Sequence, residues 1–365
     1  MYGIIPFAGA FYSRYKWRRF RKRFIELTLF PVLDYSQYRK MEDSGGIFRF
    51  TGEIESITDG RILWIKGEDL TIPVSLEKIK CFLLPKNEGN EIPEAPEQIR
   101  WNRVSTLNEG VKVYIGGQIK MQNNRLNFIS TKENPLIVIF YNCPETEFTG
   151  EIIRCARTHN EYWNALTPGS LVIGALSLIY IAAYFLNRPA FRMTVIYALV
   201  AVFIPILPVI PPGLLFTALH RRMRWYSRKF RAYWDLARLP LRYLKPGEES
   251  AVLTTGEKYG FVKLNSLPVD GAKEEIPLLI PESFMEKGKH ELLFFGVMGL
   301  NGDLPVRSKD KFASYGIMPA NPALLTRRYA VSAYIADIFA WLVLFLGISI
   351  NIVFIFMILY FLGGI

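Results

Sequence analysis

The sequence predicts a membrane protein whose apolar helices carry β-rich domains on one side of a bilayer. Three long runs are almost free of charge, two polar regions alternate apolar and polar residues around turn-forming pairs, and two short segments concentrate basic and aromatic residues. The expected fold class is an α-helical transmembrane hairpin plus a C-terminal apolar helix or hairpin, with two cytoplasmic β-rich (α+β, small barrel-like or sandwich-like) domains. The predicted domains are, in chain order, an N-terminal basic amphipathic interfacial segment (1–40), a cytoplasmic β-rich domain (41–163), a transmembrane helical hairpin (164–219), a basic aromatic juxtamembrane helix (220–246), a second cytoplasmic β-rich domain (247–328) and a C-terminal transmembrane helix or tight hairpin (329–365).

Composition limits the class of protein. Of the 365 residues, 50% are hydrophobic and 21% are charged, and the mean hydropathy is +0.16. These values exclude a disordered chain and a collagen, and they coexist when the apolar residues are clustered in a few runs. The three cysteines, Cys81, Cys143 and Cys155, are an odd number without close spacing. This count argues against a disulfide framework and favours a reducing compartment.

Three apolar runs are long enough to cross a bilayer, which takes about 20 helical residues. Residues 164–187 and 193–219 carry no charge, and the short connection between them predicts a tight helical hairpin. Residues 329–365 contain one charge, Asp337, and are longer than one straight span. A turn at residues 347–351 would make this run a hairpin, which we favour over one long, tilted helix.

Prolines interrupt the second apolar run. Each proline lacks a backbone N–H donor, and in lipid the freed carbonyl groups need partners within the protein. The run is therefore expected to form either a broken helix that lines a cavity or a kinked anchor, and the kinked anchor is the preferred interpretation. The prolines are Pro205, Pro208, Pro211 and Pro212.

Asp337 and Asn351 form a possible intramembrane polar site. A carboxylate within a membrane span is a candidate functional group, because its burial in hydrocarbon is costly. Asp337 lies only about two turns into its run, so pairing with Arg327 or Arg328 is the alternative, and we favour this structural role. Asn351 is expected to hydrogen-bond to a neighbouring helix.

Positive charge is concentrated in two segments. Residues 14–23 contain seven basic and no acidic residues, and residues 220–245 contain nine basic residues and one acidic residue, Asp235. Because these segments carry a net charge of +15 and the whole chain carries +11, the remainder is about −4. The positive-inside rule then places both polar regions in the cytoplasm. We expect an integral protein of the bacterial cytoplasmic membrane.

Aromatic residues recur at helical spacing within both basic segments. This pattern is typical of a helix in the headgroup region that binds anionic lipid. Nucleic acid is recognised by similar residues, but the acidic remainder of the chain and the adjoining spans argue against it. We expect membrane lipid as a partner and no nucleic acid. The residues predicted to bind the membrane surface are Arg14, Lys16, Trp17, Arg18, Arg19, Arg21, Lys22, Arg23, Arg221, Arg222, Arg224, Trp225, Arg228, Lys229 and Arg231.

The polar regions contain β-hairpin patterns. Asp59-Gly60 separates two alternating stretches within residues 45–84, and Asn123-Asn124 does the same within residues 111–130. After Pro135 the sequence LIVIFYN predicts a buried strand or the start of a helix, and residues 145–163 predict a helix that leads into the first apolar run. Residues 247–326 are also β-rich, with glycine and Asn-Gly turns.

The end of the first β-rich region resembles a known family. It combines the strand VYIGG, a short hairpin, the sequence FISTK and a helix-like stretch that runs straight into an apolar span. In these features residues 110–185 resemble a GIDE or BAM-type domain, a β-rich module held between membrane helices in mitochondrial membrane ubiquitin ligases and in prokaryotic membrane proteins. The resemblance implies a membrane-anchored β-rich domain. Those ligases also carry a zinc-binding RING, for which three cysteines and three histidines are too few, so ligase activity is not implied.

The sequence predicts no catalytic, cofactor or metal site. Cys143, Cys155 and His159 are an incomplete set of zinc ligands, and His290 beside Glu291 lacks a nucleophile motif. No P-loop, dinucleotide-binding glycine pattern or zincin helix is present. We therefore expect no cofactor and regard an enzyme as the less favoured class.

Three functional hypotheses follow. The leading one is a membrane scaffold that displays β-rich domains at the bilayer surface and binds copies of itself or other membrane proteins. The first alternative is a subunit of a transport assembly that uses the proline-rich span and Asp337. The second is a membrane-bound enzyme acting on lipid-linked substrates.

Overall fold

The computed structural model divides into two compact units. Unit 1 comprises Met1–Arg18, Asn160–Arg231 and Ala330–Ile365, and unit 2 comprises Arg19–His159 and Ala232–Tyr329. Helices α1 (Ile4–Leu27), α6 (Gly213–Ala237) and α8 (Pro322–Phe361) contribute residues to both units. The structure describes residues 4–28, 30–40, 46–58, 60–77, 79–85, 95–122, 125–158, 164, 166–207, 210–239, 250–252, 258–264, 292–295, 297–301, 304–307, 316–319 and 322–361.

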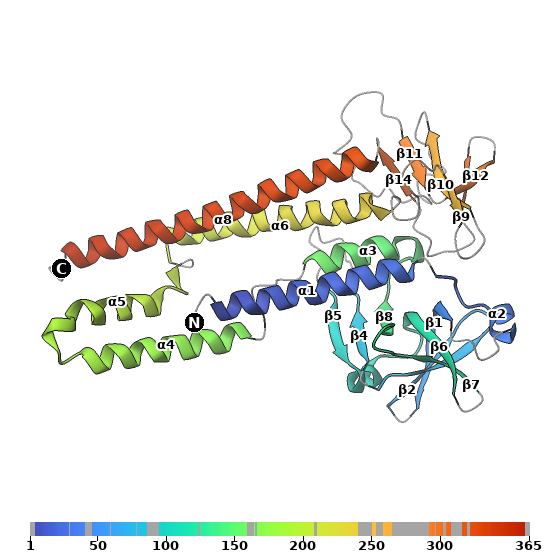
Figure 1. The fold of residues 1–365 in the computed structure, drawn as a ribbon, viewed down its shortest axis with the longest axis horizontal. Helices are drawn as coiled ribbons and strands as arrows, with labels where there is room; N and C mark the ends of the chain where they lie inside the picture. Colours follow the sequence, from blue (N-terminus) through green and yellow to red (C-terminus); the bar gives the residue numbers. More distant parts are fainter. Residues whose placement is uncertain are drawn as a thin grey trace. The chain divides into compact units, whose positions relative to one another are not determined.

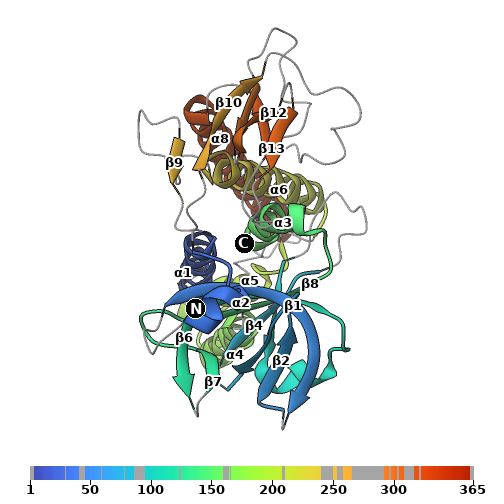
Figure 2. The same cartoon turned by 90° about the vertical axis from the view of Figure 1, so that its right-hand side faces the viewer.

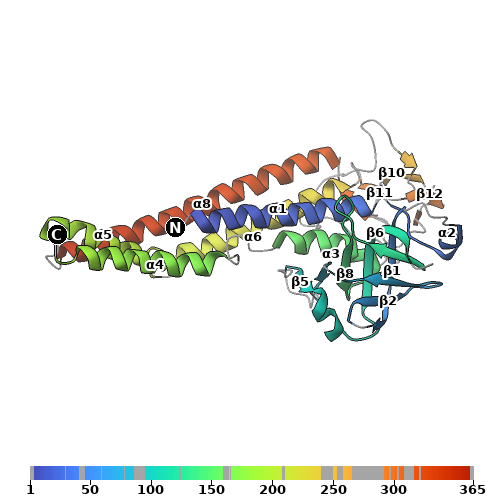
Figure 3. The ribbon, with the colours of Figure 1, turned by 60° about the horizontal axis from the view of Figure 1, so that its bottom comes forward.

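Unit 1 is built from helices and short connections in its described residues. Figures 1 and 3 show α4 (Leu166–Phe185) and α5 (Arg192–Phe203) side by side as a hairpin, joined through the short helix η2 (Pro189–Phe191). Asn164 caps α4, because its side-chain oxygen accepts a hydrogen bond from the backbone N–H of Leu166 at 3.0 Å. The first parts of α1 and α6 and most of α8 complete the unit.

Two helices of the described chain are long and apolar enough to cross a membrane. These are α4 and the part of α8 from Ala323 to Ile358. Within their most apolar windows only 22% of α4 and 17% of α8 is buried inside the protein. A core helix of a water-soluble domain would instead be covered by its neighbours on most sides.

The second predicted span, 193–219, is not one helix. α5 ends at Phe203, two residues before Pro205, and α6 begins at Gly213 after the cis peptide bond Pro211–Pro212. The 12 residues of α5 measure about 18 Å, too short for a hydrocarbon core of about 30 Å. The apolar run is therefore shared between two helices, because its prolines remove the donors that a continuous helix needs. Pro208 lies outside the described residues.

The predicted turn at residues 347–351 is also wrong. α8 is continuous from Pro322 to Phe361, so the favoured hairpin is replaced by one helix of 40 residues, about 60 Å long. Gly347 is required for close packing: a Cβ atom there would lie 2.6 Å from Cβ of Phe216 in α6. Likewise, the 220–246 segment is not a separate helix, since α6 already starts at Gly213 and ends at Ala237.

Unit 2 contains a five-stranded barrel (Figure 2). Its strands are β1 (Ile47–Thr58), β2 (Ile62–Lys66), β3 (Thr71–Ser75), β6 (Lys112–Gln122) and β7 (Arg125–Ile129). They pair in the order β1-β2-β3-β7-β6, and β6 pairs again with β1 to close the ring. All pairs are antiparallel except β3–β7. Because β6 returns to lie beside β1, strands β1, β2, β3 and β6 form a Greek key.

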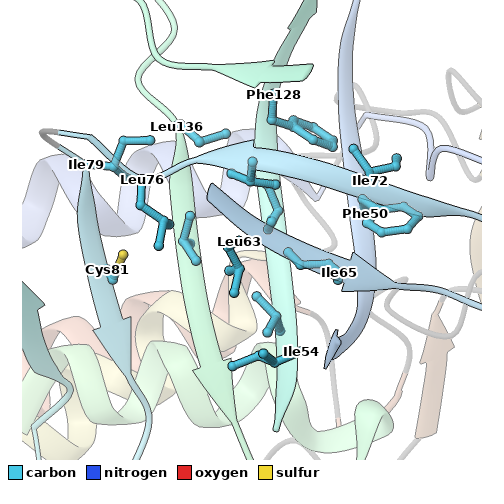
Figure 4. Close-up of a cluster of buried hydrophobic side chains, with 14 of the residues drawn as sticks. Phe50, Ile54, Leu63, Ile65, Ile72, Leu76, Ile79, Cys81, Phe128 and Leu136 are labelled. Carbon is cyan, nitrogen blue, oxygen red and sulfur yellow. The ribbon is translucent and has the colours of Figure 1, made fainter. Parts of the chain in front are cut away.

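Apolar side chains fill the barrel. Figure 4 shows the inward-pointing cluster, in which Phe50, Leu63, Ile65 and Phe128 are almost completely buried. Leu63 and Ile65 are buried whereas Ile62 and Lys66 are exposed, which is the period of two expected for a strand with one face on a core. Gly60 has φ 62°, as the predicted hairpin turn requires, although its neighbour Asp59 lies outside the described residues.

Three strands extend the sheet beyond the barrel. They are β4 (Lys80–Leu83), β5 (Glu97–Arg100) and β8 (Ile137–Tyr141), in the order β6-β8-β4-β5. The short helix η1 (Trp101–Thr106) follows β5. All five residues of β8 are buried, which resolves the predicted choice between strand and helix in favour of a buried strand. α2 (Tyr35–Lys40) precedes β1, and α3 (Glu145–Thr158) occupies the predicted helical stretch.

The second polar region is also β-rich in its described part. β9 (Ser250–Val252), β10 (Lys258–Leu264), β11 (Leu292–Phe295) and β14 (Gly316–Pro319) form one sheet in the order β14-β11-β10-β9. β12 (Val297–Asn301) and β13 (Leu304–Arg307) form a separate antiparallel pair. His290 and Glu291 lie outside the described residues.

Two glycines let β6 change partners. β8 pairs with residues 112–116 of β6 and β7 pairs with residues 118–122. At this change of partner a Cβ atom on Gly116 would lie 2.6 Å from Cδ1 of Leu27, and one on Gly117 would lie 2.4 Å from Cδ1 of Leu136. The glycine pair therefore allows α1 and the segment before β8 to approach the sheet.

Gly116→Ala is expected to destabilise unit 2 by about 1–3 kcal/mol, because the buried Leu27 has to move. Denaturant unfolding of the full chain in detergent, followed by tryptophan fluorescence, measures the loss. Gly150→Ala in α3 is the matched control: its Cβ meets nothing closer than 3.8 Å, and the change favours the helix, so stability should rise slightly. Equal effects of the two substitutions would contradict the packing argument.

Candidate functional site

Asp337 is enclosed by two arginines of the neighbouring helix. Its Oδ1 accepts a hydrogen bond from Nη1 of Arg224 at 2.7 Å, and its Oδ2 pairs with Nη2 of Arg231. The side chains of Arg224, Asp337 and Arg231 are 7%, 15% and 32% exposed. The sequence suggested Arg327 or Arg328 as the partner of Asp337. In these ion pairs the partners are instead Arg224 and Arg231.

The arginines lie on one face of α6. His220, Arg224, Ser227 and Arg231 are spaced by four, three and four residues, which places them along one side of a helix. His220 Nδ1 lies 2.7 Å from the carbonyl oxygen of Ala340, and the Ser227 hydroxyl donates to the carbonyl oxygen of Ala333 at 3.1 Å. These contacts fix an antiparallel register between α6 and α8.

Small residues on α8 receive this face. The buried positions follow a spacing of three and four residues, as in a helix–helix seam. Because most of the side chains are small, the α6 backbone can approach closely enough for a serine and a histidine to reach α8 carbonyl groups. The buried positions are Ala333, Ala336, Ala340, Val343 and Gly347.

Asn351 satisfies the backbone of the broken helix. Its amide nitrogen donates to the carbonyl oxygens of Leu207 and Ile210, the latter at 3.0 Å. These carbonyls belong to the proline-containing interruption between α5 and α6, where Leu207 also accepts a hydrogen bond from the backbone N–H of Ile210 at 3.3 Å. The structure thus brings Asn351 to the proline-rich segment, and the two residues of the predicted polar site do not meet each other: Asp337 pairs with Arg224 and Arg231.

A second ion cluster occurs within unit 2. Asp235, the one acidic residue of the basic segment, accepts hydrogen bonds at Oδ2 from Arg157 of α3 at 2.7 Å and 2.6 Å, and Arg21 of α1 lies 3.6 Å away. Arg21 also donates to the carbonyl oxygen of Ala156 at 2.9 Å. Three helices therefore meet at one buried carboxylate. The sequence analysis did not predict this cluster, although the lone acid within a run of basic residues could have pointed to it.

The basic residues predicted to bind a membrane surface differ in exposure. The exposed ones are Arg18, Arg19, Lys22, Arg221 and Arg222. The half-buried ones are Arg14, Lys16, Arg21, Arg23, Arg228, Lys229 and Arg231, and Arg224 is buried. Of the half-buried and buried residues, Arg21, Arg224 and Arg231 pair with carboxylates. Binding of anionic lipid by any of these residues stays a prediction.

The aromatic stripe of α1 packs on protein. Trp17 is 5% exposed in unit 1, and in unit 2 Phe20 packs on Phe82 with ring centroids 4.3 Å apart. Phe24 is fully buried between Tyr114 and Phe148. Trp225 is half-buried and carries the Lys229 ammonium 4.7 Å from its ring. Binding of the membrane surface by Trp17 and Trp225 stays a prediction.

The cysteines are buried or half-buried thiols. Burial raises the pKa of Cys81 and of Cys143 to about 12. Burial and the neighbouring Glu151 raise the pKa of Cys155, whose thiol donates to Glu151 Oε1 at 3.5 Å. Among the described residues no group of three His, Cys, Asp or Glu side chains is placed to hold a metal ion. His159, the third member of the incomplete zinc set, lies outside that part of the chain.

The three thiols are expected to resist alkylation near neutral pH. The thiolate is the reactive form, and a rise of the pKa from 9.0 to about 12 lowers its population about a thousandfold. Iodoacetamide labelling of the folded chain, counted by mass spectrometry, should be at least about a hundredfold slower than labelling of the denatured chain. A Lys22→Cys variant, at a side chain that is 76% exposed, provides the reactive control. Labelling of the native thiols at the rate of this control would contradict the burial argument.

Alkaline pH is expected to destabilise unit 2. The folded state keeps the Cys81 proton up to a pKa of about 12, whereas the unfolded chain loses it above 9.0, so the free energy of unfolding falls as pH rises through this window. The slope for one such thiol is at most about 1.4 kcal/mol per pH unit. Unfolding of the full chain as a function of pH measures it, and Cys81→Ala should make the slope shallower. An unchanged slope would show that Cys81 does not cause the loss.

Comparisons with family models, with curated proteins and with solved structures gave no match for this chain.

Proposed function

We propose that this chain is an integral membrane scaffold, which spans a bilayer through unit 1 and displays the barrel and the strands of unit 2 at its surface. The observation that carries the proposal is the contrast between the units. α4 and α8 leave most of their apolar length uncovered, whereas the barrel of unit 2 encloses a core of almost completely buried side chains. A protein that lies wholly in water would cover the apolar side chains of α4 and α8 as it covers those of the barrel.

The exposed side chains of unit 1 are those that lipid favours. A water-soluble protein rarely exposes an apolar patch larger than a few hundred Å². Here α8 alone exposes large apolar residues along its whole length from residue 331 to residue 361. Residues 338–361 carry no charge and measure about 36 Å as a helix, and α4 measures about 30 Å, so each fits one span.

Chain connectivity supports the orientation. The chain passes between the units at four points, next to Arg18, His159, Arg231 and Tyr329. Three of these points, those at Arg18, Arg231 and Tyr329, lie in or beside a basic stretch. Unit 2 therefore belongs on the cytoplasmic side by the positive-inside rule. The exposed arginines and lysine are placed to attract anionic lipid, each by about 1 kcal/mol. The bacterial cytoplasmic membrane remains the proposed location.

The contacts of the polar groups support a scaffold over a transporter. A carboxylate that moves protons or ions has to lose and regain its partners, but both oxygens of Asp337 are held by arginine guanidinium groups. Asn351 is likewise engaged, by carbonyls of the broken helix. These groups are better suited to joining helices than to forming a pathway. No described cluster of side chains favours the enzyme hypothesis.

The proposal is tested by photo-crosslinking of the full chain in native membranes. A photoreactive amino acid is placed at Ile62 or Met121, apolar residues exposed on the barrel, and at Phe354, exposed on α8. We expect the probe at Ile62 or Met121 to form a crosslink to protein in a constant ratio to the chain. This crosslink should be lost when an excess of unlabelled chain or of its partner is added. Phe354 should give lipid adducts that resist high-salt washing. Barrel positions that give only hydrolysed probe would overturn the scaffold, and recovery of the chain in the aqueous phase without detergent would overturn the membrane assignment.

A further inference from the structure

The first half of α1 exposes large apolar side chains next to its basic residues. Within unit 1 the helix buries Ala10, Ser13 and Trp17, which are spaced by three and four residues. The opposite side is uncovered, and Ile4 is 80% exposed. Phe11, Tyr12 and Tyr15 are also exposed, and Phe7, whose ring contacts Trp341, is 45% exposed.

Contacts within unit 1 show which residues of α8 lie beside the first half of α1. The Phe7 and Trp341 rings stack with centroids 6.2 Å apart, and the His220 ring packs edge-on against the same Trp341 at 6.1 Å. At the start of α4, Asn164 donates to the carbonyl oxygen of Pro6 at 3.2 Å. Four helices are thus aligned at one level, which lies just beyond Asp337 on the apolar side of α8.

The three long helices change from charged to apolar at this same level. In α8 the change falls at Asp337, after which residues 338–361 are uncharged. In α6, which runs the opposite way, exposed Leu219 precedes Arg221. In α1 the change falls between Tyr12 and Arg14. Since the aligned changes come from helices that are far apart in sequence, they define a common boundary plane.

From this plane we infer that α1 enters one leaflet of the bilayer with its N-terminus first, and does not lie flat in the headgroup region. The inference rests on the proposed membrane function. Ile4 and the exposed part of Phe7 contact acyl chains, and the tyrosines lie at the interface, where such rings are favoured. The exposed basic residues Arg18, Arg19 and Lys22 meet anionic headgroups. Residue 4 is then about 16 Å deeper than residue 15 along the helix axis.

The packing of α1 argues against the flat arrangement predicted from the sequence. A helix in the membrane plane needs an uncovered apolar face along its whole length. The second half of α1 has no such face, because Phe20, Phe24 and Leu27 are buried within unit 2. The uncovered apolar residues are confined to the first half, and they continue the exposed apolar surface of α8 and α4 beyond the boundary plane.

Depth measurements test the inference. Single cysteines replace Ile4, Phe11, Tyr15 and Lys22 in the full chain and receive a nitroxide label. The chain without an added cysteine is labelled in parallel, to correct for any reaction of half-buried Cys143. The chain is reconstituted in vesicles of phosphatidylglycerol and phosphatidylethanolamine, and collision with oxygen is compared with collision with a water-soluble nickel complex. We expect oxygen access to be greatest at Ile4 and to fall steadily towards Lys22, with the nickel complex showing the reverse order.

Reference labels at Val172 in α4 and Val353 in α8 separate two kinds of failure. If both references are deep but the four α1 positions have equal depth, or Ile4 is open to the nickel complex, the tip-first insertion of α1 is overturned and the membrane span stands. If the references are themselves open to water, the proposed membrane function fails. Deep references with a graded α1 support both.

Discussion

Asp337→Ala is expected to lower the free energy of unfolding by about 3 kcal/mol. The substitution leaves Arg224 and Arg231 without their shared carboxylate, and removing one member of a buried ion cluster costs about 3–5 kcal/mol. The lower end applies because the Arg231 side chain is 32% exposed and is partly screened by solvent. Unfolding of the full chain in mixed micelles of increasing dodecyl sulfate content measures the loss.

A double-mutant cycle separates the ion pair from the loss of side-chain volume. Arg224→Met combined with Asp337→Ala should be less destabilising than the sum of the two single changes. Once Asp337→Ala has removed the carboxylate that pairs with Arg224, replacing Arg224 costs less. Ile338→Ala is the matched control, because its side chain lies next to Asp337 in sequence and is exposed. Equal losses for Asp337→Ala and Ile338→Ala, with additive cycle energies, would show that Asp337 does not join α6 to α8.

Local patterns in the sequence were sufficient for the hairpin between β1 and β2. Gly60 turns the chain between β1 and β2, and alternation of apolar residues then determines which faces are buried, because both depend on residues adjacent in sequence. The stretch after Pro135 was ambiguous for the same reason, since a short apolar run fits a buried strand or a helix equally well. Its pairing with β6 and β4 decides for a strand.

Contacts between distant segments could not be predicted. Closure of the barrel depends on pairs between β1 and β6 and between β3 and β7, which are separated by more than 40 residues and leave no mark on local periodicity. The turn expected at Gly347 failed because the glycine serves the approach of Phe216, 131 residues earlier. Glycine alone does not distinguish a turn from close packing.

The polar residues were easier to find than their partners. Asp337 and Asn351 stand out as polar residues in apolar sequence, because a costly residue needs a specific reason to be present. Asp235 was noted only as the one acidic residue of a basic segment, and its role was not predicted. Their partners come from other helices: Arg224 and Arg231 for Asp337, and Arg157 and Arg21 for Asp235. Spacing within one helix carries no information about which neighbour packs against it.

Asp235→Ala is expected to destabilise unit 2 by about 3–5 kcal/mol, the larger of the two ion-cluster effects. Its side chain is 8% exposed, and those of Arg21 and Arg157 are 11% and 16% exposed, so solvent screens this cluster less than the cluster at Asp337. The loss leaves two guanidinium groups buried where α1, α3 and α6 meet. Denaturant unfolding followed by tryptophan fluorescence measures it, and Arg157→Met in the same background should recover part of the loss.

A surface pair provides the comparison for this prediction. Lys22 and Glu26 lie 3.6 Å apart on α1 with side chains 76% and 44% exposed, so Glu26→Ala should cost about 0.5 kcal/mol or less. The same helix thus carries a buried and an exposed ion pair, and the ratio of the two losses reports on burial more reliably than either alone. If Asp235→Ala costs no more than Glu26→Ala, the carboxylate is hydrated in solution, and the three helices are held together by their apolar contacts, such as Phe24 on Phe148.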